Sequence, residues 1–448
     1  MGDGTLRREL CAGPAGRADR DHPYTPAACP AALEQRRVRI DQSPDLDHSS
    51  RPAGRVRLAI VLATGMAVCM SPGPIIGIFS RFFIDDLGLT RTELGAVATG
   101  HAFAIMACSV PLGYLADRIG GRRMLALMLG FVFLGLGTMS LSWGLWSLFV
   151  FGMIAGVPAA GGNSATNGII VENVRAGSRG WITGIKQSGV QIGVFAAGAV
   201  LPVAAELLGW RQALVLASLV AVVLIVVTLL VIPTTSRPRS LQQVIGSRGG
   251  VPRAVWWLSA YGVTMGIGVG VYHAFVPLYV QEEVGMSVGL AGSVIAASGA
   301  TGAVARIVWG RIAERAGDPA LSLASIGVLS VGSIALTWMA SPTVSLLVWG
   351  GAVLMGVGAG AWMSVGMFAA LTLAGPQRIG RGTAFVMLGF GMGLTVGPVL
   401  FGWAVDTSGS YDPALAATLL NFAASVVLML VWKVLRNRST ALSSPAAG

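Results

Sequence analysis

Long apolar stretches separated by short polar breaks fill the chain from about residue 57 to residue 435. A run of about 20 apolar residues is long enough to cross the hydrocarbon core of a bilayer. Helices are the expected form, because each backbone polar group in lipid must be satisfied within its own span. The pattern therefore predicts an all-α membrane protein with twelve transmembrane helices. The twelve predicted spans are residues 57–82, 94–116, 124–141, 145–171, 179–206, 211–233, 254–281, 287–313, 319–340, 343–373, 381–405 and 413–434.

The polar breaks also indicate how the chain is divided. The longest break inside the apolar region follows the sixth span and contains proline, glycines and four arginines, as expected of a linker. The first 56 residues are rich in Arg, Asp, Pro and Ala without periodicity, which favours disorder; a start codon assigned too far upstream explains this segment equally well. The predicted organisation is a disordered cytoplasmic tail at 1–56, a six-helix half at 57–233, a cytoplasmic linker at 234–253, a second six-helix half at 254–435 and a cytoplasmic tail at 436–448.

Composition supports membrane insertion and argues against a nucleic-acid partner. Of the 448 residues, 54% are hydrophobic and 11% are charged, whereas soluble domains carry roughly 25% charged residues. The net charge of +11 comes from Arg and Lys that gather in the first tail and in alternate breaks between spans. Because positive residues mark cytoplasmic loops, this distribution predicts two cytoplasmic termini in a bacterial plasma membrane. The basic charge then reflects orientation and gives no reason to expect a polyanionic partner.

A charged turn between the second and third predicted spans is the most specific motif in the chain. It combines two glycines, one acid and three bases, namely Gly113, Asp117, Arg118, Gly120, Arg122 and Arg123. A weaker copy lies about 200 residues later, between spans eight and nine, as Gly310, Glu314, Arg315 and Gly317. The dipeptide that opens span five also recurs at the start of span eleven with a similar offset, at Arg179-Gly180 and Arg381-Gly382. The two offsets predict tandem, similar halves, which is one of the established plans of transporters.

This motif resembles the signature of the major facilitator superfamily, which has the same order of glycine, acid and bases between its second and third helices. The resemblance covers residues 57 to about 435. It implies two pseudo-symmetric six-helix halves and secondary transport by rocker-switch alternating access. It also implies a gating role for the motif, in which Asp117 and Arg118 stabilise the outward-facing state through contacts with the eleventh helix near Arg381. The alternative for the motif is a solvated cytoplasmic turn.

Within that superfamily the chain resembles bacterial permeases for small anions, of the cyanate, monocarboxylate and oxalate/formate types. The similar segments are residues 184–189, the arginine Arg306 in span eight, and residues 406–411. One position departs from the pattern: monocarboxylate carriers often have an aspartate one turn before the arginine, and this chain has Gly302. The resemblance therefore favours anion transport in general over proton-coupled lactate transport.

Two cations, Lys186 in span five and Arg306 in span eight, lie inside predicted spans, and no Asp or Glu lies deep in any span. A charge at this depth is expensive and usually faces a water-filled cavity. Without an acidic partner in the chain, an anionic substrate is the expected partner, and the guanidinium fork suits a carboxylate. The alternative for Lys186 is a side chain that snorkels to the interface.

Several uncharged polar residues accompany these cations. Substrate contact and hydrogen bonds between helices are equally compatible with them; they are Asn163 and Asn167 in span four and Gln187 and Gln191 in span five. His273 in span seven is the candidate for proton coupling, because its solution pKa lies near neutrality, although a structural role is the common one for a lone histidine. His101 in span two is a weaker candidate.

The remaining motifs restrict the function further. The chain contains no Gly-x-x-x-x-Gly-Lys-Ser/Thr sequence, no His-Glu-x-x-His and no nucleophile elbow, so we expect neither ATP drive nor an enzyme. Its four cysteines have no paired spacing, and no cofactor or metal is expected. The prediction is a monomeric secondary transporter of a small organic anion, with proton coupling or anion exchange left open. The alternatives are a multidrug efflux antiporter and a solute sensor that does not transport.

Overall fold

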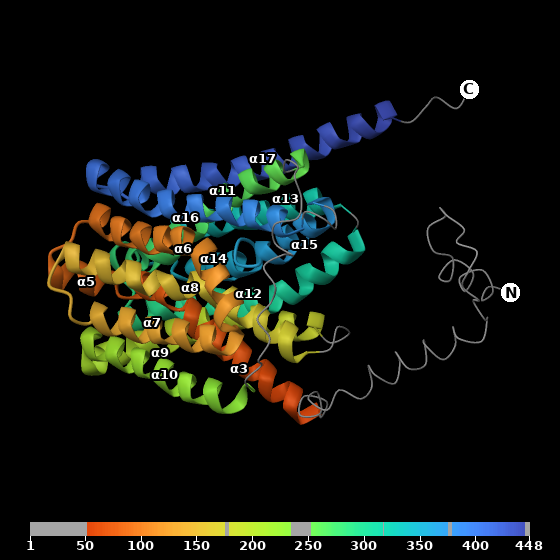
Figure 1. Ribbon diagram of the computed structural model, residues 1–448. Coiled ribbons are helices and arrows are strands. Elements are labelled where there is room, and N and C mark those ends of the chain that lie inside the picture. Colours follow the sequence, from red (N-terminus) through yellow and green to blue (C-terminus); the bar gives the residue numbers. More distant parts are fainter. Residues whose placement is uncertain (1–51, 175–178, 234–251, 317, 375–378, 444–448) are drawn as a thin grey trace, which may run out of the picture. The chain divides into compact units, whose positions relative to one another are not determined.

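The computed structural model describes residues 52–174, 179–233, 252–316, 318–374 and 379–443, all of which form helices or short connections between helices. The helices are α3 (Pro52–Met70), α4 (Pro72–Ile78), α5 (Ser80–Leu87), α6 (Arg91–Ile119), α7 (Gly121–Met139), α8 (Leu145–Asn173), α9 (Arg179–Leu208), α10 (Trp210–Val231), α11 (Arg253–Glu282), α12 (Val288–Ala316), α13 (Pro319–Trp338), α14 (Leu346–Val357), α15 (Trp362–Ala374), α16 (Ile379–Ser408) and α17 (Asp412–Ser443). Figure 1 shows them as a bundle of long helices within residues 56–443.

The prediction of an all-α membrane protein is confirmed. Eleven segments in the described part of the chain are long and apolar enough to cross a membrane, and a bent pair, α3 with α4, makes a twelfth if it is counted as one span. The observed helices fall within a few residues of the predicted spans, except at the two chain ends. There α3 begins at Pro52, and α17 continues to Ser443, so part of the tail predicted at 436–448 is helical.

Two predicted spans are broken rather than continuous. The first span bends by 46° between α3 and α4, where Pro72 and Pro74 open the second helix. Proline cannot donate a helical hydrogen bond and its ring clashes with the preceding turn, so a helix ends before it. The tenth span is interrupted by a turn at residues 358–361, between α14 and α15. The backbone carbonyl oxygen of Gly360 in this turn accepts hydrogen bonds from Gln191 of α9 and Arg306 of α12.

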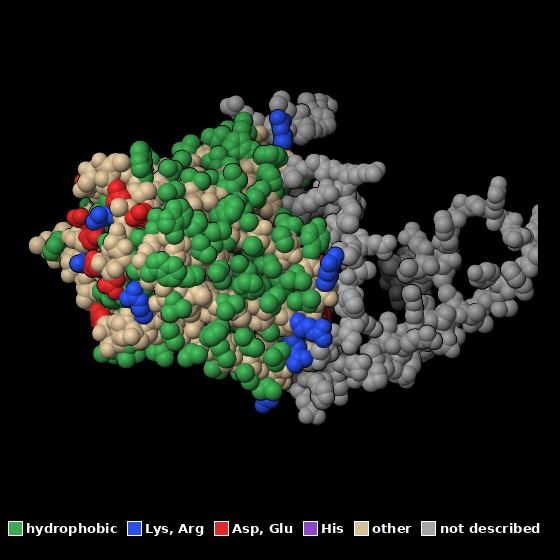
Figure 2. All heavy atoms as spheres, turned by 60° about the vertical axis from the view of Figure 1, so that its left-hand side comes forward, with side chains coloured by type: hydrophobic (Ala, Val, Ile, Leu, Met, Phe, Trp, Pro, Cys, Tyr) green, Lys and Arg blue, Asp and Glu red, His purple; other side chains and the backbone are tan. Residues whose placement is uncertain are grey.

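The surface of the bundle has the polarity expected of a protein in lipid. Figure 2 shows a broad area of hydrophobic side chains, with charged side chains gathered at its two ends. The exposed side of α10 illustrates this composition, with Leu219, Val223 and Leu230 all turned outward. Such apolar exposure is rare on soluble monomers, and it is the requirement for a lipid-facing helix.

The most extensive contacts between the first sequence half and the second are those of α9 with α12, α6 with α16, and α4 with α11. The backbones approach closely at glycines. A Cβ on Gly77 of α4 would collide with the carbonyl oxygen of His273 in α11, and one on Gly95 of α6 would collide with the carbonyl oxygen of Pro398 in α16. Only glycine permits this approach, so these contacts hold helices of the two sequence halves side by side around a central space.

Candidate functional site

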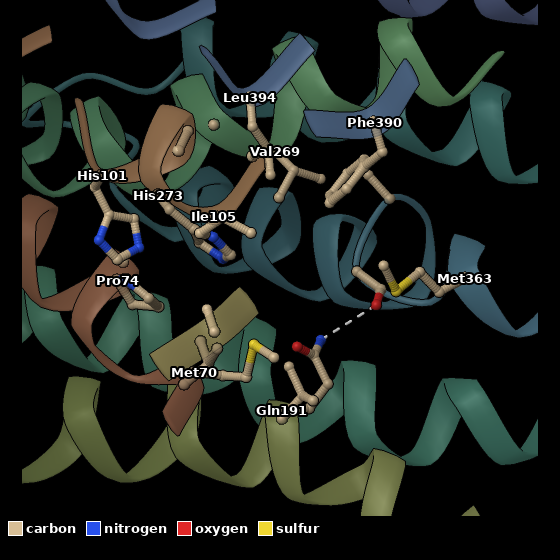
Figure 3. A pocket seen from close by; sticks show the side chains of 18 of the residues that line it. Met70, Pro74, His101, Ile105, Gln191, Val269, His273, Met363, Phe390 and Leu394 are labelled. Atoms are coloured by element: carbon tan, nitrogen blue, oxygen red, sulfur yellow. Dashed lines mark hydrogen bonds between the residues drawn. The ribbon is translucent and has the colours of Figure 1, made fainter. Parts of the chain in front are cut away.

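A cavity of about 200 Å³ lies between the two sequence halves. Its walls come from α3, α4, α6, α8 and α9 in the first half, and from α11, α12, α15, α16 and the turn before α15 in the second. Most of the lining is apolar, and only a few polar side chains reach it (Figure 3). The lining includes Met70, Pro74, His101, Ile105, Asn163, Gln187, Gln191, Val269, His273, Arg306, Gly360, Trp362, Met363, Phe390 and Leu394.

Arg306 on α12 brings a positive charge to this cavity. Its Nε donates to the carbonyl oxygen of Gly360 at 3.1 Å, and its Nη1 donates to the carbonyl oxygen of Gln187 at 3.0 Å. The first carbonyl belongs to the turn before α15 and the second to α9, in the other sequence half. Carbonyl dipoles satisfy two of the five guanidinium donors but do not neutralise the charge. No carboxylate pairs with Arg306 among the described residues.

Lys186 on α9 is fully buried, with 0% of the residue exposed. Its Nζ donates to Asn163 Oδ1 at 3.1 Å and to Asn167 Oδ1 at 2.8 Å, both on α8. The side chain therefore does not snorkel to the surface. It does not line the cavity either, and lies behind Asn163, which does. Because an ammonium only donates, both amides turn their oxygens to Lys186 and keep their Nδ2 donors for other partners.

The two glutamines of α9 lie beside Arg306. Gln187 and Gln191 both line the cavity, and Gln191 Nε2 donates to the carbonyl oxygen of Gly360 at 3.4 Å (Figure 3). That carbonyl thus accepts from Gln191 and Arg306 together. Gln191 also fills the space beside Gly302, where a Cβ would collide with its Nε2. An aspartate in place of Gly302 would require this amide to move.

Two histidines line the cavity away from the glutamines. Figure 3 shows His101 and His273 near one another, on the opposite side from Gln191 and Met363. His101 on α6 is 7% exposed, and its Nδ1 lies 3.3 Å from the carbonyl oxygen of Gly152. The His273 ring on α11 has no hydrogen-bond partner in the described part of the chain.

Charged groups join the two halves at the end of the bundle where α6 begins, here called the Arg91 end. Arg91 Nη2 donates to Glu282 Oε2 at 2.7 Å, and Tyr411 OH donates to the same oxygen at 2.6 Å. Asp406 accepts from the backbone N–H groups of Arg91 and Thr92, at 3.2 and 2.7 Å, and from the Thr92 hydroxyl at 2.6 Å. A carboxylate from α16 thereby caps the N-terminus of α6, where the helix dipole favours negative charge.

The sequence motifs lie at the other end of the bundle, here called the signature end, where α6 and α12 finish. Asp117 is half-buried and Arg118 exposed, and neither makes a hydrogen bond or ion pair with a described residue. The side chain of Arg381, their expected neighbour, lies outside the described residues. The glycine between α6 and α7, Gly120, has a φ of 83° that suits glycine. Arg122 donates through Nη2 to the carbonyl oxygen of Leu229.

The weaker motif copy at the signature end has equally few contacts. Gly310 has open space around it, since a Cβ there would meet no atom within 4 Å. Glu314 and Arg315 are exposed, and neither forms an ion pair with the described residues. A gating contact for either copy thus stays a prediction.

Among the described residues, many helices could span a membrane, and a cavity lies between the two sequence halves. This arrangement is typical of secondary transporters. A family model for the Major Facilitator Superfamily matches residues 58–360 and 258–448. The chain therefore belongs to the major facilitator superfamily, and it is a multi-pass integral membrane transporter and not an enzyme.

Curated relatives are distant. The probable sulfoacetate transporter SauU of Cupriavidus necator is 24% identical over 368 residues, which cover 73% of this chain and 82% of that protein. Two uncharacterized MFS-type transporters from strains of Mycobacterium tuberculosis are each 25% identical over 238 residues, 52% of both chains. The chain thus matches about half the length of those two proteins.

Solved structures with the same fold include other membrane transporters. A bacterial homolog of the human lysosomal transporter Spinster, in an inward-facing and unoccupied conformation, superposes with a TM-score of 0.66 at 16% identity, covering 85% of this chain and 96% of that one. A mutant of the nucleoside transporter NupG superposes with a TM-score of 0.69 at 14% identity, covering 85% of this chain and 99% of that one. At these identities the likeness concerns the fold alone.

Proposed function

We propose that this chain is a secondary active transporter of a small organic anion, which binds in the central cavity with its acidic group at Arg306. One observation carries the proposal: the cavity holds a cation whose described protein contacts are all neutral. Each ion pair between described residues involves an acid at a helix end, and none of these acids lines the cavity.

The energetics favour an anion as the missing partner. Removing a charge from water costs several kcal/mol, and neutral dipoles recover only part of that cost. An acidic ligand that pairs with Arg306 would recover more of it, and the guanidinium has donors left for both oxygens of a carboxylate. Gln187 and Gln191 supply further polar contacts beside the same position. A cationic drug, the cargo of the efflux alternative, would instead meet the repulsion of Arg306.

Lys186 contributes from behind the cavity wall. Its ammonium fixes the amides of Asn163 and Asn167 by hydrogen bonds to their oxygens. In Asn163, which lines the cavity, this leaves an N–H donor for the ligand. The charge of Lys186 also adds to the positive potential at the site, since Coulomb interactions are long-ranged in a medium of low dielectric constant.

Transport would proceed by a rocker-switch exchange of contacts between the two ends of the bundle. Among the residues that the structure describes, charged side chains join the two halves at the Arg91 end and not at the signature end. We propose that the signature end faces the cytoplasm, and that the opposite state breaks the contacts of Arg91 and Asp406 while Asp117 gains partners near Arg381. Coupling to a proton taken up by His273, or exchange against a second anion, would drive the cycle.

The relative SauU supports the chemical class, since sulfoacetate is a small organic anion. The proposal commits to that class and to no individual compound. This chain and SauU are 24% identical. The polar residues that line the cavity of this chain determine which organic acid binds there.

Uptake of labelled short-chain carboxylates into proteoliposomes tests the proposal. Arg306→Met removes the charge and keeps an apolar side chain, and we expect uptake to fall by about thirtyfold or more. Arg311→Ala removes an exposed arginine from the same helix and should leave uptake unchanged. Undiminished uptake by Arg306→Met, with the variant inserted at wild-type level, would disprove the anion site while leaving the family assignment intact.

A further inference from the structure

We infer that the cavity holds its ligand at a second position, where His101 Nε2 accepts a hydrogen bond from a hydroxyl or amide N–H of the ligand. This inference rests on the proposed function, because Arg306 provides the first position by binding the acidic group. The ligand class that follows is an organic acid with a hydrogen-bond donor at its other end.

The hydrogen bond of His101 to the backbone fixes which ring nitrogen carries the proton. Nδ1 lies 3.3 Å from the carbonyl oxygen of Gly152, and a carbonyl oxygen can only accept. The proton is therefore on Nδ1. A second proton would place a charge on a ring that is 7% exposed, and no carboxylate lines the cavity to pair with it. In the neutral ring Nε2 is an acceptor, so its partner must be a donor.

The free nitrogen lies next to a gap left by a glycine. A Cβ on Gly73 of α4 would lie 3.2 Å from His101 Nε2, and both residues line the cavity. The glycine thus keeps open the space beside Nε2. No described protein group donates to this nitrogen, so an acceptor on a buried side chain lies at the cavity without a protein partner. Binding cavities orient a ligand with a few polar groups of this kind, which points to a ligand donor at this position.

The wall beside the histidine is apolar. Figure 3 shows Ile105, Val269 and Leu394 on the same side of the cavity as the histidines, and Phe390 further along. An aliphatic segment gains free energy by contact with such side chains, at about 25 cal/mol per Å² of apolar area removed from water. The expected ligand is therefore amphipathic, with an acidic head, an aliphatic middle and a donor at the far end. A second carboxylate in the ligand would not fit beside His101, because a carboxylate has no hydrogen-bond donor for Nε2.

Matched ligands test the donor directly. We would measure competition for binding to the purified full-length protein at about pH 8, where a histidine of ordinary pKa is neutral. The probes are butanoate, pentanoate and hexanoate, each with its ω-hydroxy and ω-methoxy derivative. We expect at least one ω-hydroxy acid to bind about five- to tenfold more tightly than its parent acid and its methyl ether. The ether matters because its oxygen accepts but cannot donate.

Variants assign the preference to His101. His101→Phe keeps a planar apolar ring and should abolish the preference for the hydroxyl while the parent acids still bind. Gly73→Ala retains the histidine and crowds Nε2 with a methyl group, so it should weaken the same preference by a second route. Arg306→Met should weaken the binding of all nine probes alike.

The outcomes separate this inference from the proposed function. If the wild-type protein binds the parent, hydroxy and methoxy acids equally, the second position is wrong and the anion site stands. A hydroxyl preference that survives in both His101→Phe and Gly73→Ala would also overturn the assignment. If no acid binds to the wild-type protein, both proposals fail.

Discussion

At the Arg91 end of the bundle, charged side chains of one sequence half bind the other half, whereas at the signature end the described charges do not. Arg91 pairs with Glu282 over a separation of 191 residues in the chain, and Asp406 caps α6 from 315 residues away. Asp117 and Glu314 have no such partner among the described residues. Charged residues at the helix ends therefore do not by themselves join the two halves. Their carboxylates must also lie within hydrogen-bonding distance of donors in the other half.

The described contacts between the halves become fewer along the helices from the Arg91 end to the signature end. Next to the Arg91 end, the Thr99 hydroxyl donates to the carbonyl oxygen of Thr395 at 2.5 Å. Half-way along, Arg306 binds the carbonyl oxygen of Gln187. Towards the signature end, a Cβ on Gly113 would meet nothing closer than the hydroxyl of Ser164 in the same half, at 3.9 Å. Under the proposed mechanism, variants that loosen the Arg91 end should move the protein toward the opposite state.

The largest expected effect follows from Asp406→Ala. The substitution removes three hydrogen bonds and leaves two N–H groups at the start of α6 without their carboxylate. A hydrogen bond to a charged group contributes about 1.5–3 kcal/mol to stability. We therefore expect the loss of this carboxylate to destabilise the described state by about 2 kcal/mol relative to the opposite state. A cysteine at Thr99, in a background without native cysteines, should react about thirtyfold faster with an impermeant maleimide.

Asp412→Ala is the control for this prediction. Asp412 also lies at this end, but its carboxylate accepts from Trp338 within the same sequence half. Loss of that bond should leave the maleimide reaction unchanged. Equal acceleration in both variants would mean that Asp406 stabilises the fold locally and does not hold the halves together.

A smaller effect is expected for Glu282→Gln. The amide oxygen can still accept from Tyr411, but the opposite charge beside Arg91 is lost. Both partners of this ion pair are partly exposed, at 34% and 21%, which limits its contribution to about 1 kcal/mol. We expect about a fivefold increase in the same maleimide reaction. Arg81→Ala, which removes an ion pair within α5, should have no effect, and an equal effect would rule out a specific role of Glu282.

The helices of both ends could be predicted from the sequence, but their pairing could not. Apolar runs of about 20 residues identify spans by themselves, whereas a single sequence does not show which helix ends meet in space. Glu282 and Asp406 were recognisable only as charges at helix ends. The break before Pro72 had a signal in its two prolines, and it was missed because the surrounding run is continuously apolar.

The polar residues in and directly behind the cavity wall had a signal in the sequence, whereas the apolar residues of the wall had none. Lys186, Arg306 and the amides of α8 and α9 are conspicuous because charged and amide groups are rare inside apolar spans. Asn163 and Asn167 are four residues apart, which places them on the same face of a helix. The spacing does not indicate that both amides bind Lys186. Phe390 and Trp362 gave no signal, since an apolar residue that faces a cavity and one that faces lipid look alike in sequence.

At the signature end, Asp117→Asn should change the rate of transport more than the affinity for the ligand. Asp117 has no partner among the described residues in this state, so neutralising it leaves the cavity and the contacts of the Arg91 end as they are. The opposite state, in which we propose that Asp117 gains partners, should lose about 1 kcal/mol. We expect the maximal rate of uptake to fall severalfold with ligand affinity unchanged; a loss of affinity alone would speak against gating.

The smallest effect concerns Asp318, which lies just after α12 near the weaker motif copy. Its partners among the described residues all belong to its own half. It accepts from Arg436 at 2.6 Å and lies 3.8 Å from Lys433, both on α17. Burial by itself would raise the pKa of Asp318, but the hydrogen bonds from Arg436 and from the Ala320 N–H, with the charges of Arg436 and Lys433, lower it below the ordinary value. A depressed pKa stabilises the fold above the pH where the unfolded group titrates, about 4, and this contribution is lost as the pH falls through the folded pKa.

Because both α13 and α17 belong to the second half, Asp318→Asn should remove about 1 kcal/mol or less of stability near neutral pH without changing maleimide access at either end. The difference in melting temperature between variant and wild type should shrink as the pH is lowered from about 5 to about 3. A difference that stays constant over this range would show that the Asp318 carboxylate is not stabilised by its two bases. A change in maleimide access would mean that Asp318 helps to join the two halves. The signature end would then also have a charged group that holds the halves together, contrary to the difference between the two ends described above.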